Sequence, residues 1–268
     1  MEVRAKKALG QHFLTDLNIA QKIVESLQTV TGTEGRVLEI GPGMGVLSRF
    51  LLDREDIDFK MVEIDEESVN YLRSHFPGAC GRLLQADFLK LSFGKIFDGP
   101  FSIIGNLPYN ISSPIFFRVF EERDIVPQMV CMIQKEVADR IAGKPGNKNY
   151  GILSVLLQTW FDIEYLFSVE ASAFAPPPKV RSAVIRLRRN SRTSLPCSET
   201  LFKSVVKTSF GQRRKTLRNS LRPLVATKAQ KEGWDAEALQ KFTSAPVWNL
   251  RPEDLGAEEF INLTLSLE

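Results

Sequence analysis

One stretch, residues 101–110, most constrains how this chain can fold. It begins as an apolar run, breaks at Gly105 and ends in Asn106-Leu107-Pro108-Tyr109. An apolar run bounded by Gly and Pro is typical of a buried strand that ends in a tight loop. In open α/β sheets, ligands bind at loops that follow the carboxyl ends of strands. The stretch therefore predicts an α/β sheet with a functional loop at its edge.

The residue types in this loop suit the binding of an amino group. Asn106 offers a neutral amide oxygen, while Pro108 fixes its own φ and pushes Leu107 toward an extended conformation. Two fixed acceptors, the Asn106 amide and the Leu107 carbonyl, can take both hydrogens of one –NH2 group, and Tyr109 adds a flat face. Taken alone, the motif is equally well interpreted as a turn before a helix.

A second motif upstream is typical of nucleotide-type folds. The strand expected at Arg36–Ile40 runs into the glycine turn of residues 41–45, and a helical pattern follows. A second apolar run ends at Glu63, 22 residues after Gly41, where an acid can accept hydrogen bonds from both ribose hydroxyls. The NAD fingerprint G-x-G-x-x-G is not met, because Val46 stands at the third Gly position, which disfavours a dehydrogenase.

A third short strand ends at Asp87, which Phe88 follows. An acid there can accept from an adenine amino group while the Phe ring packs on the base, although for Asp87 taken alone a helix N-cap is the favoured role. Apolar patterns predict seven strands in all, with helices on both faces of one sheet; these strands are expected at 36–40, 59–64, 82–87, 101–104, 128–134, 161–169 and 180–187.

Between the last two strands, three consecutive prolines, residues 176–178, form a stiff extended segment. This stiffness would fix Phe174 in place. A rigid aromatic at the end of a strand serves as a core plug or as a stacking surface, and for an isolated Phe the core plug is favoured.

Composition excludes several classes of protein. No run approaches about 18 apolar residues, so no membrane span is predicted. The basic N-terminus lacks an apolar segment, so we expect no secretory signal and a cytoplasmic location. Three cysteines without metal-like spacing, and only two histidines, His12 and His75, predict no metal site and no His-based triad.

Charge is distributed unevenly along the chain. Residues 186–222 contain eleven Lys/Arg and one acid, a charge of +10, so the rest carries −7 of the net +3. Such a field suits a polyanion. A linker at 191–198 predicts two domains, 1–190 and a small helical, basic domain at 191–268. Helices are expected at 201–210, 213–224 and 252–267, with phosphate contacts from Arg213, Arg214, Lys215 and Arg218, the second and fourth of which would share a helical face.

The combination of motifs resembles the bacterial small-subunit (16S) rRNA adenine N(6),N(6)-dimethyltransferases of the KsgA type. The matching stretches span Lys6 to Leu221: KKALGQHFL, VLEIGPGMGVLS, MVEID, LLQADFL, IIGNLPYNISSPI, FAPPPKVRSAVIRL and FGQRRKTLRNSL. The last of these is the most specific. The resemblance implies a Rossmann-like α/β methyltransferase domain with a small C-terminal helical domain that binds rRNA, and S-adenosylmethionine as cofactor.

The resemblance also implies roles for matching residues. Gln11, His12 and Leu14 would close over the cofactor, where the family usually has Asn in place of His12. Gly41 and Gly43 would lie against its methionine part, Glu63 on its ribose, and Asp87 with Phe88 at its adenine. Asn106, with Leu107 and Pro108, would hold the target amine beside the cofactor. Tyr109 and Phe174 would sandwich a flipped adenine.

The implied reaction is the double methylation of two adjacent adenosines in a hairpin loop near the 3′ end of 16S rRNA, within the small subunit or its precursor. We expect a monomer that contributes orientation and electrostatics to catalysis, not a strong base. Two alternatives remain open from sequence. One is an Erm-type enzyme that methylates 23S rRNA, and the other is a subunit-assembly factor whose catalysis is secondary.

Overall fold

The computed structural model describes residues 3–6 and 9–268, which form two compact units. The first unit comprises the chain up to Asp139 together with Phe161–Arg189, and the second comprises Arg140–Trp160 and Asn190–Glu268. The predicted domains, 1–190 and 191–268, differ from this division at Asn190 and, more extensively, at residues 140–160. Residues 140–160 belong to the second unit, because the apolar helix α6 (Ile152–Trp160) packs against helices of that unit.

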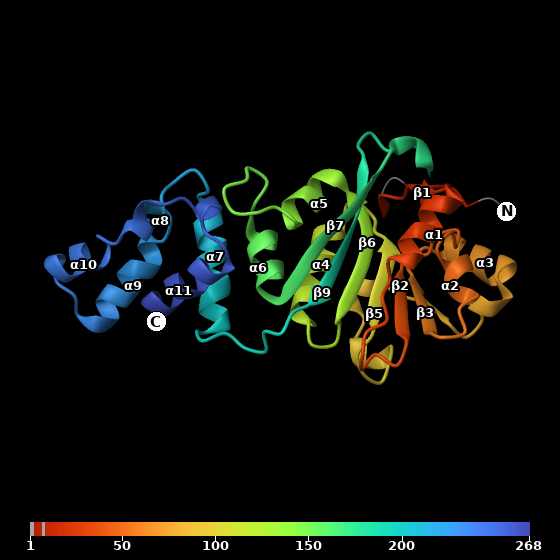
Figure 1. Ribbon diagram of the computed structural model, residues 1–268, viewed down its shortest axis with the longest axis horizontal. Helices are drawn as coiled ribbons and strands as arrows, with labels where there is room; N and C mark the ends of the chain where they lie inside the picture. Colours follow the sequence, from red (N-terminus) through yellow and green to blue (C-terminus); the bar gives the residue numbers. More distant parts are fainter. Residues whose placement is uncertain (1–2, 7–8) are drawn as a thin grey trace. The chain divides into compact units, whose positions relative to one another are not determined.

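The first unit is built on a seven-stranded sheet with the order β4-β3-β2-β5-β6-β9-β7, as predicted in number (Figure 1). Its first five strands are parallel, and β9 runs antiparallel to both of its neighbours. The strands are β2 (Arg36–Ile40), β3 (Asp58–Glu63), β4 (Leu83–Gln85), β5 (Ser102–Asn106), β6 (Gln128–Gln134), β7 (Phe161–Val169) and β9 (Ser182–Arg189).

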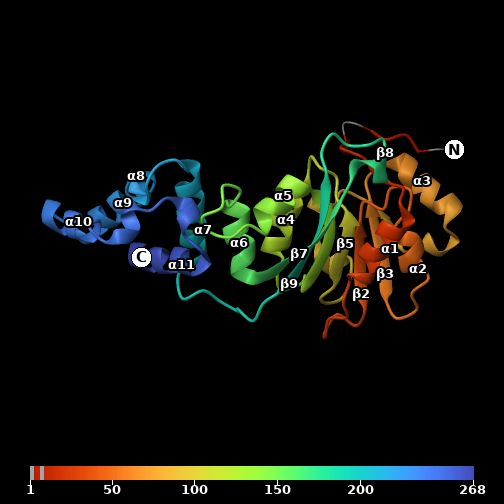
Figure 2. The same cartoon turned by 45° about the horizontal axis from the view of Figure 1, so that its top comes forward.

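Apolar side chains on both faces of the central strands require helices on both sides. On one face, Ile104 and Val130 belong to a core cluster with residues of α1 (Leu17–Glu25) and α2 (Ser48–Leu52). Helix α3 (Glu66–His75) lies on the same side, and α4 (Ser112–Glu121) lies on the other (Figures 1 and 2).

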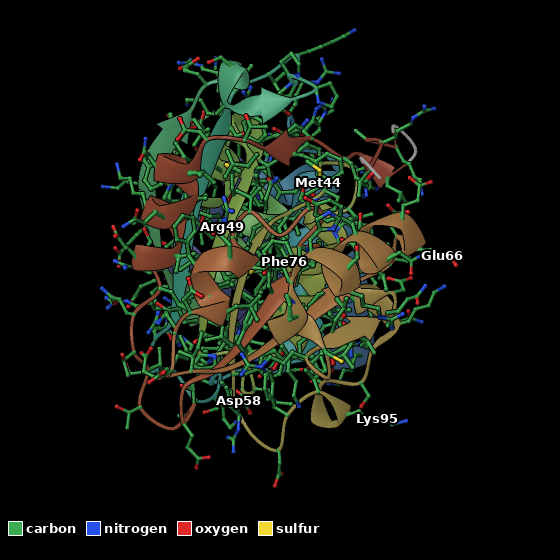
Figure 3. All side chains as sticks on the ribbon, turned by 90° about the vertical axis from the view of Figure 1, so that its right-hand side faces the viewer. Met44, Arg49, Asp58, Glu66, Phe76 and Lys95 are labelled. Carbon is green, nitrogen blue, oxygen red and sulfur yellow. The ribbon has the colours of Figure 1, made fainter. Side chains whose placement is uncertain are left out.

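The parallel strands β2, β3 and β5 end at the same edge of the sheet, which brings their following loops together. Figure 3 shows Met44, in the glycine loop after β2, at one end of this unit and Asp58, where β3 begins, at the other. The predicted ligand-binding residues therefore share one edge.

A separate two-stranded sheet joins the N-terminal arm, which includes residues 9–15, to the proline-rich segment around residues 174–178. Strand β1 (Phe13–Leu14) pairs antiparallel with β8 (Phe174–Ala175), and the Thr15 N–H donates to the Ala173 carbonyl at 2.8 Å. This pairing was not predicted. It holds the arm against the edge of the first unit.

The second unit is helical. It contains α6, α7 (Glu199–Gly211), α8 (Leu217–Ser220), α9 (Arg222–Glu232), α10 (Ala236–Phe242) and α11 (Ala257–Leu267). The continuous helix predicted over 213–224 is wrong: α7 ends at Gly211, residues 212–214 form a turn, and α9 begins at Arg222 with Pro223 in its first turn. No helix in the described part of the chain is long and apolar enough to cross a membrane.

Candidate functional site

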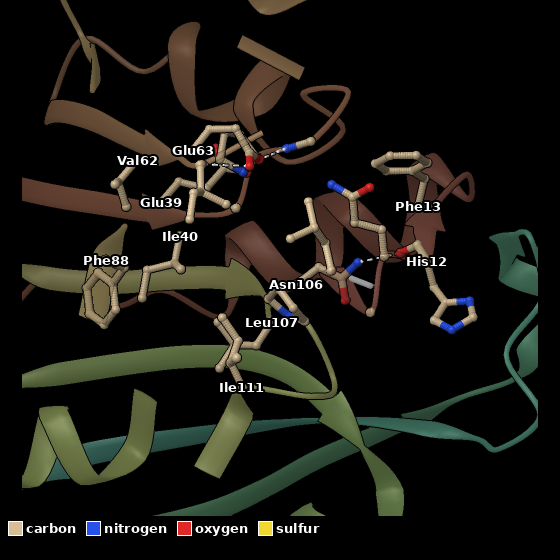
Figure 4. A pocket seen from close by; sticks show the side chains of 18 of the residues that line it. His12, Phe13, Glu39, Ile40, Val62, Glu63, Phe88, Asn106, Leu107 and Ile111 are labelled. Carbon is tan, nitrogen blue, oxygen red and sulfur yellow. Dashed lines mark hydrogen bonds between the residues drawn. The ribbon is translucent and has the colours of Figure 1, made fainter. Parts of the chain in front are cut away.

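A pocket in the first unit lies where β2, β3 and β5 end (Figure 4). It gathers residues that are far apart in the sequence. Twelve of the predicted site residues line it: Gln11, His12, Leu14, Gly41, Gly43, Glu63, Asp87, Phe88, Asn106, Leu107, Pro108 and Tyr109. Phe174 is not among the lining residues.

The glycine loop of residues 41–45 contacts the N-terminal arm directly. Gly43 has φ +56°, and a Cβ on it would lie 2.9 Å from the ring of Phe13. A larger residue would therefore push the arm away from the loop and strain the backbone. The arm is also held by Lys6, which forms ion pairs with Asp65 and Glu67.

The Glu63 carboxylate is fixed by the backbone of its own loop and of the glycine loop. Its Oε1 accepts from the N–H groups of Ile64 (2.8 Å) and Asp65 (2.9 Å), and its Oε2 accepts from Gly43 N–H at 3.1 Å. Burial raises its pKa, while these three hydrogen bonds act in the opposite direction. A carboxylate has about four acceptor directions, so one remains open. Binding both hydroxyls of a ribose would require Gly43 N–H to release Oε2.

Glu39 is a second carboxyl group in the pocket wall, which sequence reasoning missed. It is 1% exposed, and the Ser48 hydroxyl donates to its Oε2 at 2.6 Å. Burial raises the pKa of Glu39 to about 8, although the Ser48 hydrogen bond opposes this. The acid inside the apolar run Arg36–Ile40 was the available signal, since a charge in a buried strand needs a reason.

Asp87 caps a short helix and also lines the pocket. Its Oδ1 accepts from Leu89 N–H at 3.0 Å, which caps a short 3-10 helix (Phe88–Lys90), and Lys90 lies 3.5 Å from Oδ2. Its side chain is still partly exposed to the pocket. Phe88 is buried and packs on Phe93 with ring centroids 5.3 Å apart, so it presents only part of its ring to the pocket.

Asn106 ends β5 with its side-chain amide oriented by the arm. Its Nδ2 donates to the His12 carbonyl oxygen at 3.0 Å, which leaves Oδ1 as the acceptor directed elsewhere. Gly105 allows this strand end to lie close to β2, because a Cβ there would come within 2.6 Å of the Ile40 carbonyl oxygen. The next residue is fixed too, since Leu107 N–H donates to the Met132 carbonyl at 3.0 Å.

Tyr109 is held at both ends of its side chain. Its hydroxyl lies 2.5 Å from the hydroxyl of Ser182, which is fully buried in β9, and its ring centroid lies 5.2 Å from that of His12. Partial burial raises the pKa of the phenol. The ring is therefore a fixed surface beside Asn106.

The three predicted site residues of the arm, Gln11, His12 and Leu14, have different surroundings. Leu14 is buried in the core, and the Gln11 Oε1 accepts from the Lys6 backbone N–H at 2.9 Å. The His12 ring points away from Glu63 and Phe88, as Figure 4 shows, and its Nδ1 lies 2.9 Å from the Pro176 carbonyl oxygen. Only the His12 backbone, not its ring, contacts Asn106 through a hydrogen bond in this structure.

Phe174 occupies the position of a core residue. Its side chain is 4% exposed and belongs to the hydrophobic cluster that includes Leu14 and Val184. The structure therefore does not present Phe174 as a stacking face, and the simpler core-plug interpretation describes its place here.

The predicted phosphate-binding residues lie in the second unit in two kinds of surroundings. Arg213 is bonded within the protein, to Glu253 at 3.4 Å and to the Asn147 carbonyl at 3.3 Å. Arg214 and Lys215 are exposed, and no acid pairs with either in the described part of the chain. Arg214 and Arg218 do not share a helical face, because α8 begins at Leu217.

Arg218 is also exposed, and its Nη2 donates to the Thr243 carbonyl at 2.7 Å. Several other cations of the basic segment pair with acids of their own unit: Arg186 and Arg188 with Glu164, Arg189 with Asp124, Arg192 with Glu258, and Lys203 with Glu199. The charge excess of the segment is thus concentrated on fewer side chains than the sequence suggested.

Comparison with known proteins gives consistent results. A model of the family described as ribosomal RNA adenine dimethylase matches residues 2–241. Proteins named ribosomal RNA small subunit methyltransferase A are 54% identical, in Parabacteroides distasonis over 98% of this chain and 94% of the relative, and in Porphyromonas gingivalis over 100% and 99%.

Two solved structures share the fold over nearly the whole chain. A dimethyladenosine transferase from Plasmodium falciparum superposes with a TM-score of 0.76 at 23% identity, covering 96% of each chain. The 23S rRNA methyltransferase ErmE superposes with a TM-score of 0.65 at 28% identity, covering 95% of this chain and 99% of its own.

Proposed function

Because this chain belongs to the ribosomal RNA adenine dimethylase family, we propose that it dimethylates two adjacent adenosines in a hairpin loop near the 3′ end of 16S rRNA. It is a methyltransferase that uses S-adenosylmethionine and acts on ribosomal RNA. The observation that carries the proposal is the oriented amide of Asn106 at the end of β5, in a chain 54% identical to small-subunit enzymes over almost its full length.

The pocket fits S-adenosylmethionine by the chemistry of its donors and acceptors. The buried Glu63 carboxylate keeps one acceptor direction open for a ribose hydroxyl, and Asp87 with Phe88 offers a polar acceptor beside an apolar ring. Gly41 and Gly43 let the backbone approach the methionine part. When bound, S-adenosylmethionine supplies an electrophilic methyl group.

The protein's own contribution is to orient the adenine amine. An exocyclic amine of adenine is a poor nucleophile, because its lone pair is delocalised into the ring. Asn106 Oδ1 and the Leu107 carbonyl can accept its two hydrogens, which favours a pyramidal nitrogen with its lone pair directed at the methyl group. Such positioning lowers the barrier through orientation and preorganised electrostatics.

A base in RNA must leave its stack to reach this pocket. Tyr109, fixed through Ser182, is the aromatic surface available beside Asn106 to receive it. The exposed cations Arg214, Lys215 and Arg218 in the second unit are proposed to contact phosphates of the subunit RNA. The enzyme would then act as a monomer in the cytoplasm, where ribosomal subunits are found.

Methyl transfer to purified ribosomal subunits tests the proposal. Small subunits and large subunits that lack the modification are incubated separately with the enzyme and labelled S-adenosylmethionine, and the rRNA is digested for mass spectrometry. We expect N(6),N(6)-dimethyladenosine in the small-subunit RNA only. Labelling confined to the large subunit would refute the proposal.

The second candidate is an Erm-type 23S rRNA methyltransferase. The superposition on ErmE favours it, because both units are covered in that match. Identity argues against it, since 28% to ErmE compares with 54% to the small-subunit enzymes. The large-subunit arm of the same experiment distinguishes the two.

A further inference from the structure

The backbone and the ring of His12 contact different parts of the site. Its carbonyl oxygen accepts the hydrogen bond from Asn106 that orients the amide, whereas its imidazole points away from Glu63 and Phe88 (Figure 4). The resemblance of the arm to a cofactor-closing motif therefore does not describe what the ring contacts.

The ring lies against Tyr109. The two centroids are 5.2 Å apart with the ring planes inclined by 33°, within the range of favourable aromatic contacts. Tyr109 cannot easily withdraw, because its hydroxyl is hydrogen-bonded to the buried Ser182. The imidazole is thus set against a fixed aromatic surface, the one proposed above to receive the flipped base.

The ring is also held at its Nδ1 by the proline-rich segment. His12 Nδ1 lies 2.9 Å from the carbonyl oxygen of Pro176, which can only accept, so Nδ1 carries a hydrogen and donates it. Pro176 directly follows β8, the strand that pairs with β1 of the arm. Three segments that are distant in the sequence, at His12, Tyr109 and Pro176, therefore meet around one imidazole.

We propose that the His12 imidazole is a wall of the subsite that receives the target adenine, and not a ligand of the methyl donor. A base that stacks on Tyr109 beside Asn106 would contact the edge or face of this ring. The inference rests on the function proposed above and assigns His12 to base recognition within it. A ring at this position widens the aromatic surface for a planar base, which a small amide side chain could not do.

Three substitutions of His12 distinguish the contribution of its ring from that of its hydrogen bond to Pro176. His12→Ala removes both, His12→Asn keeps a donor toward Pro176 without a ring, and His12→Phe keeps a ring without the donor. All three retain the backbone carbonyl that orients Asn106. The matched control is His75→Ala, because His75 stacks on Tyr71 at 4.0 Å on the exposed side of α3, outside the pocket.

Each variant is measured for S-adenosylmethionine affinity by calorimetry, for KM and kcat on unmethylated small subunits at saturating S-adenosylmethionine, and for melting temperature. We expect His12→Ala and His12→Asn to lower kcat/KM roughly three- to tenfold, the size of one aromatic contact. His12→Phe should keep most of the wild-type kcat/KM. The affinity for S-adenosylmethionine should change less than about twofold in all variants.

Any of three results would overturn the inference. Two of them are weaker S-adenosylmethionine binding by His12→Ala with unchanged KM and kcat, and wild-type kcat/KM in His12→Asn. A melting temperature that falls while KM and kcat hold would mean that the ring only braces the arm, which also overturns it. Failure of the wild type to methylate small subunits refutes the proposed function instead. The variants are then compared on whichever RNA the wild type methylates, so the two failures remain distinguishable.

Discussion

The side-chain amide of Asn106 donates from Nδ2 to the backbone carbonyl of His12 at 3.0 Å, across 94 residues of sequence. A carbonyl can only accept, so this bond fixes which way the amide faces. Oδ1 is therefore the atom left to accept from a substrate amine. The arm thus helps to set the polarity of the site as well as covering it.

Removal of this amide should affect methyl transfer far more than folding. We expect Asn106→Ala to lower the single-turnover rate by more than tenfold, which corresponds to about 1.4 kcal/mol of barrier. The control is Asn70→Ala on the exposed side of α3. A smaller loss in rapid-quench measurements would mean that orientation by Asn106 is not the main contribution.

Glu63→Gln should weaken S-adenosylmethionine binding by roughly 1–3 kcal/mol, because a charge-assisted acceptor is replaced by a neutral amide within a ring of backbone donors. Calorimetry provides the measurement. Glu66→Gln is the matched control, since Glu66 lies only three residues away and is exposed (Figure 3). Equal affinities for the two variants would remove Glu63 from the binding site.

Glu39 should make the protein less stable as the pH rises. Its pKa is raised to about 8 in the folded state from 4.5, so between these values the folded protein holds a proton that the unfolded chain has released. Stability from this group is full below pH 4.5 and falls as the pH approaches 8, by at most about 1.4 kcal/mol per pH unit.

The test compares the wild type with Glu39→Gln, in which the amide oxygen can still accept from Ser48. Urea unfolding at pH 5, 6, 7 and 8 should give a difference in stability that shifts in favour of Glu39→Gln with increasing pH. A difference that stays constant across this range would show that Glu39 is already ionised in the folded protein.

Phe174→Ala should cost about 3–5 kcal/mol of stability, as expected for a large buried side chain. Phe174 is 4% exposed and packed in the core cluster. Tyr165→Ala, at a residue that is 37% exposed, is the control. If Phe174→Ala instead melts like the wild type and loses activity, the stacking role implied by the family resemblance is the correct one.

Replacement of Arg214 and Lys215 by Gln should weaken binding to small subunits and flatten its salt dependence. Each lost phosphate contact should reduce the slope of log affinity against log salt by roughly 0.7–0.9. Lys203→Gln, which loses a cation paired with Glu199, should keep the wild-type slope. A double variant with an unaltered slope would show that this turn is only a solvated surface.

Local patterns predicted much of the fold and of the site. Apolar runs located all seven strands of the main sheet, and short motifs at Gly41, Glu63 and Asn106 identified residues that line one pocket. These inferences succeeded because strand length, turn residues and the shared edge of parallel strands are encoded within a few positions.

What could not be predicted depends on partners that are distant in sequence. The pairing of Leu14 with Phe174 joins two distant segments, and nothing near residue 174 reveals it, although the burial of Phe174 agrees with the core plug that its isolated position favoured. Similarly, the sequence does not distinguish Arg213 from the basic residues next to it, but in the structure Arg213 pairs with Glu253. The helix predicted over 213–224 failed for a local reason, because the turn after Gly211 and the new helix that begins at Arg222, with Pro223 in its first turn, outweighed the apolar spacing.

The pairing of β1 with β8 has a consequence for the order of events during synthesis. The arm leaves the ribosome first, but Phe174 follows Leu14 by 160 residues. At about 5–20 residues per second, the arm must wait on the order of 8–32 s for its partner strand. A nascent chain that stops before Phe174 possesses the glycine loop, Glu63 and Asn106, yet has no strand with which the arm can pair. The ability to bind S-adenosylmethionine should therefore develop late in translation.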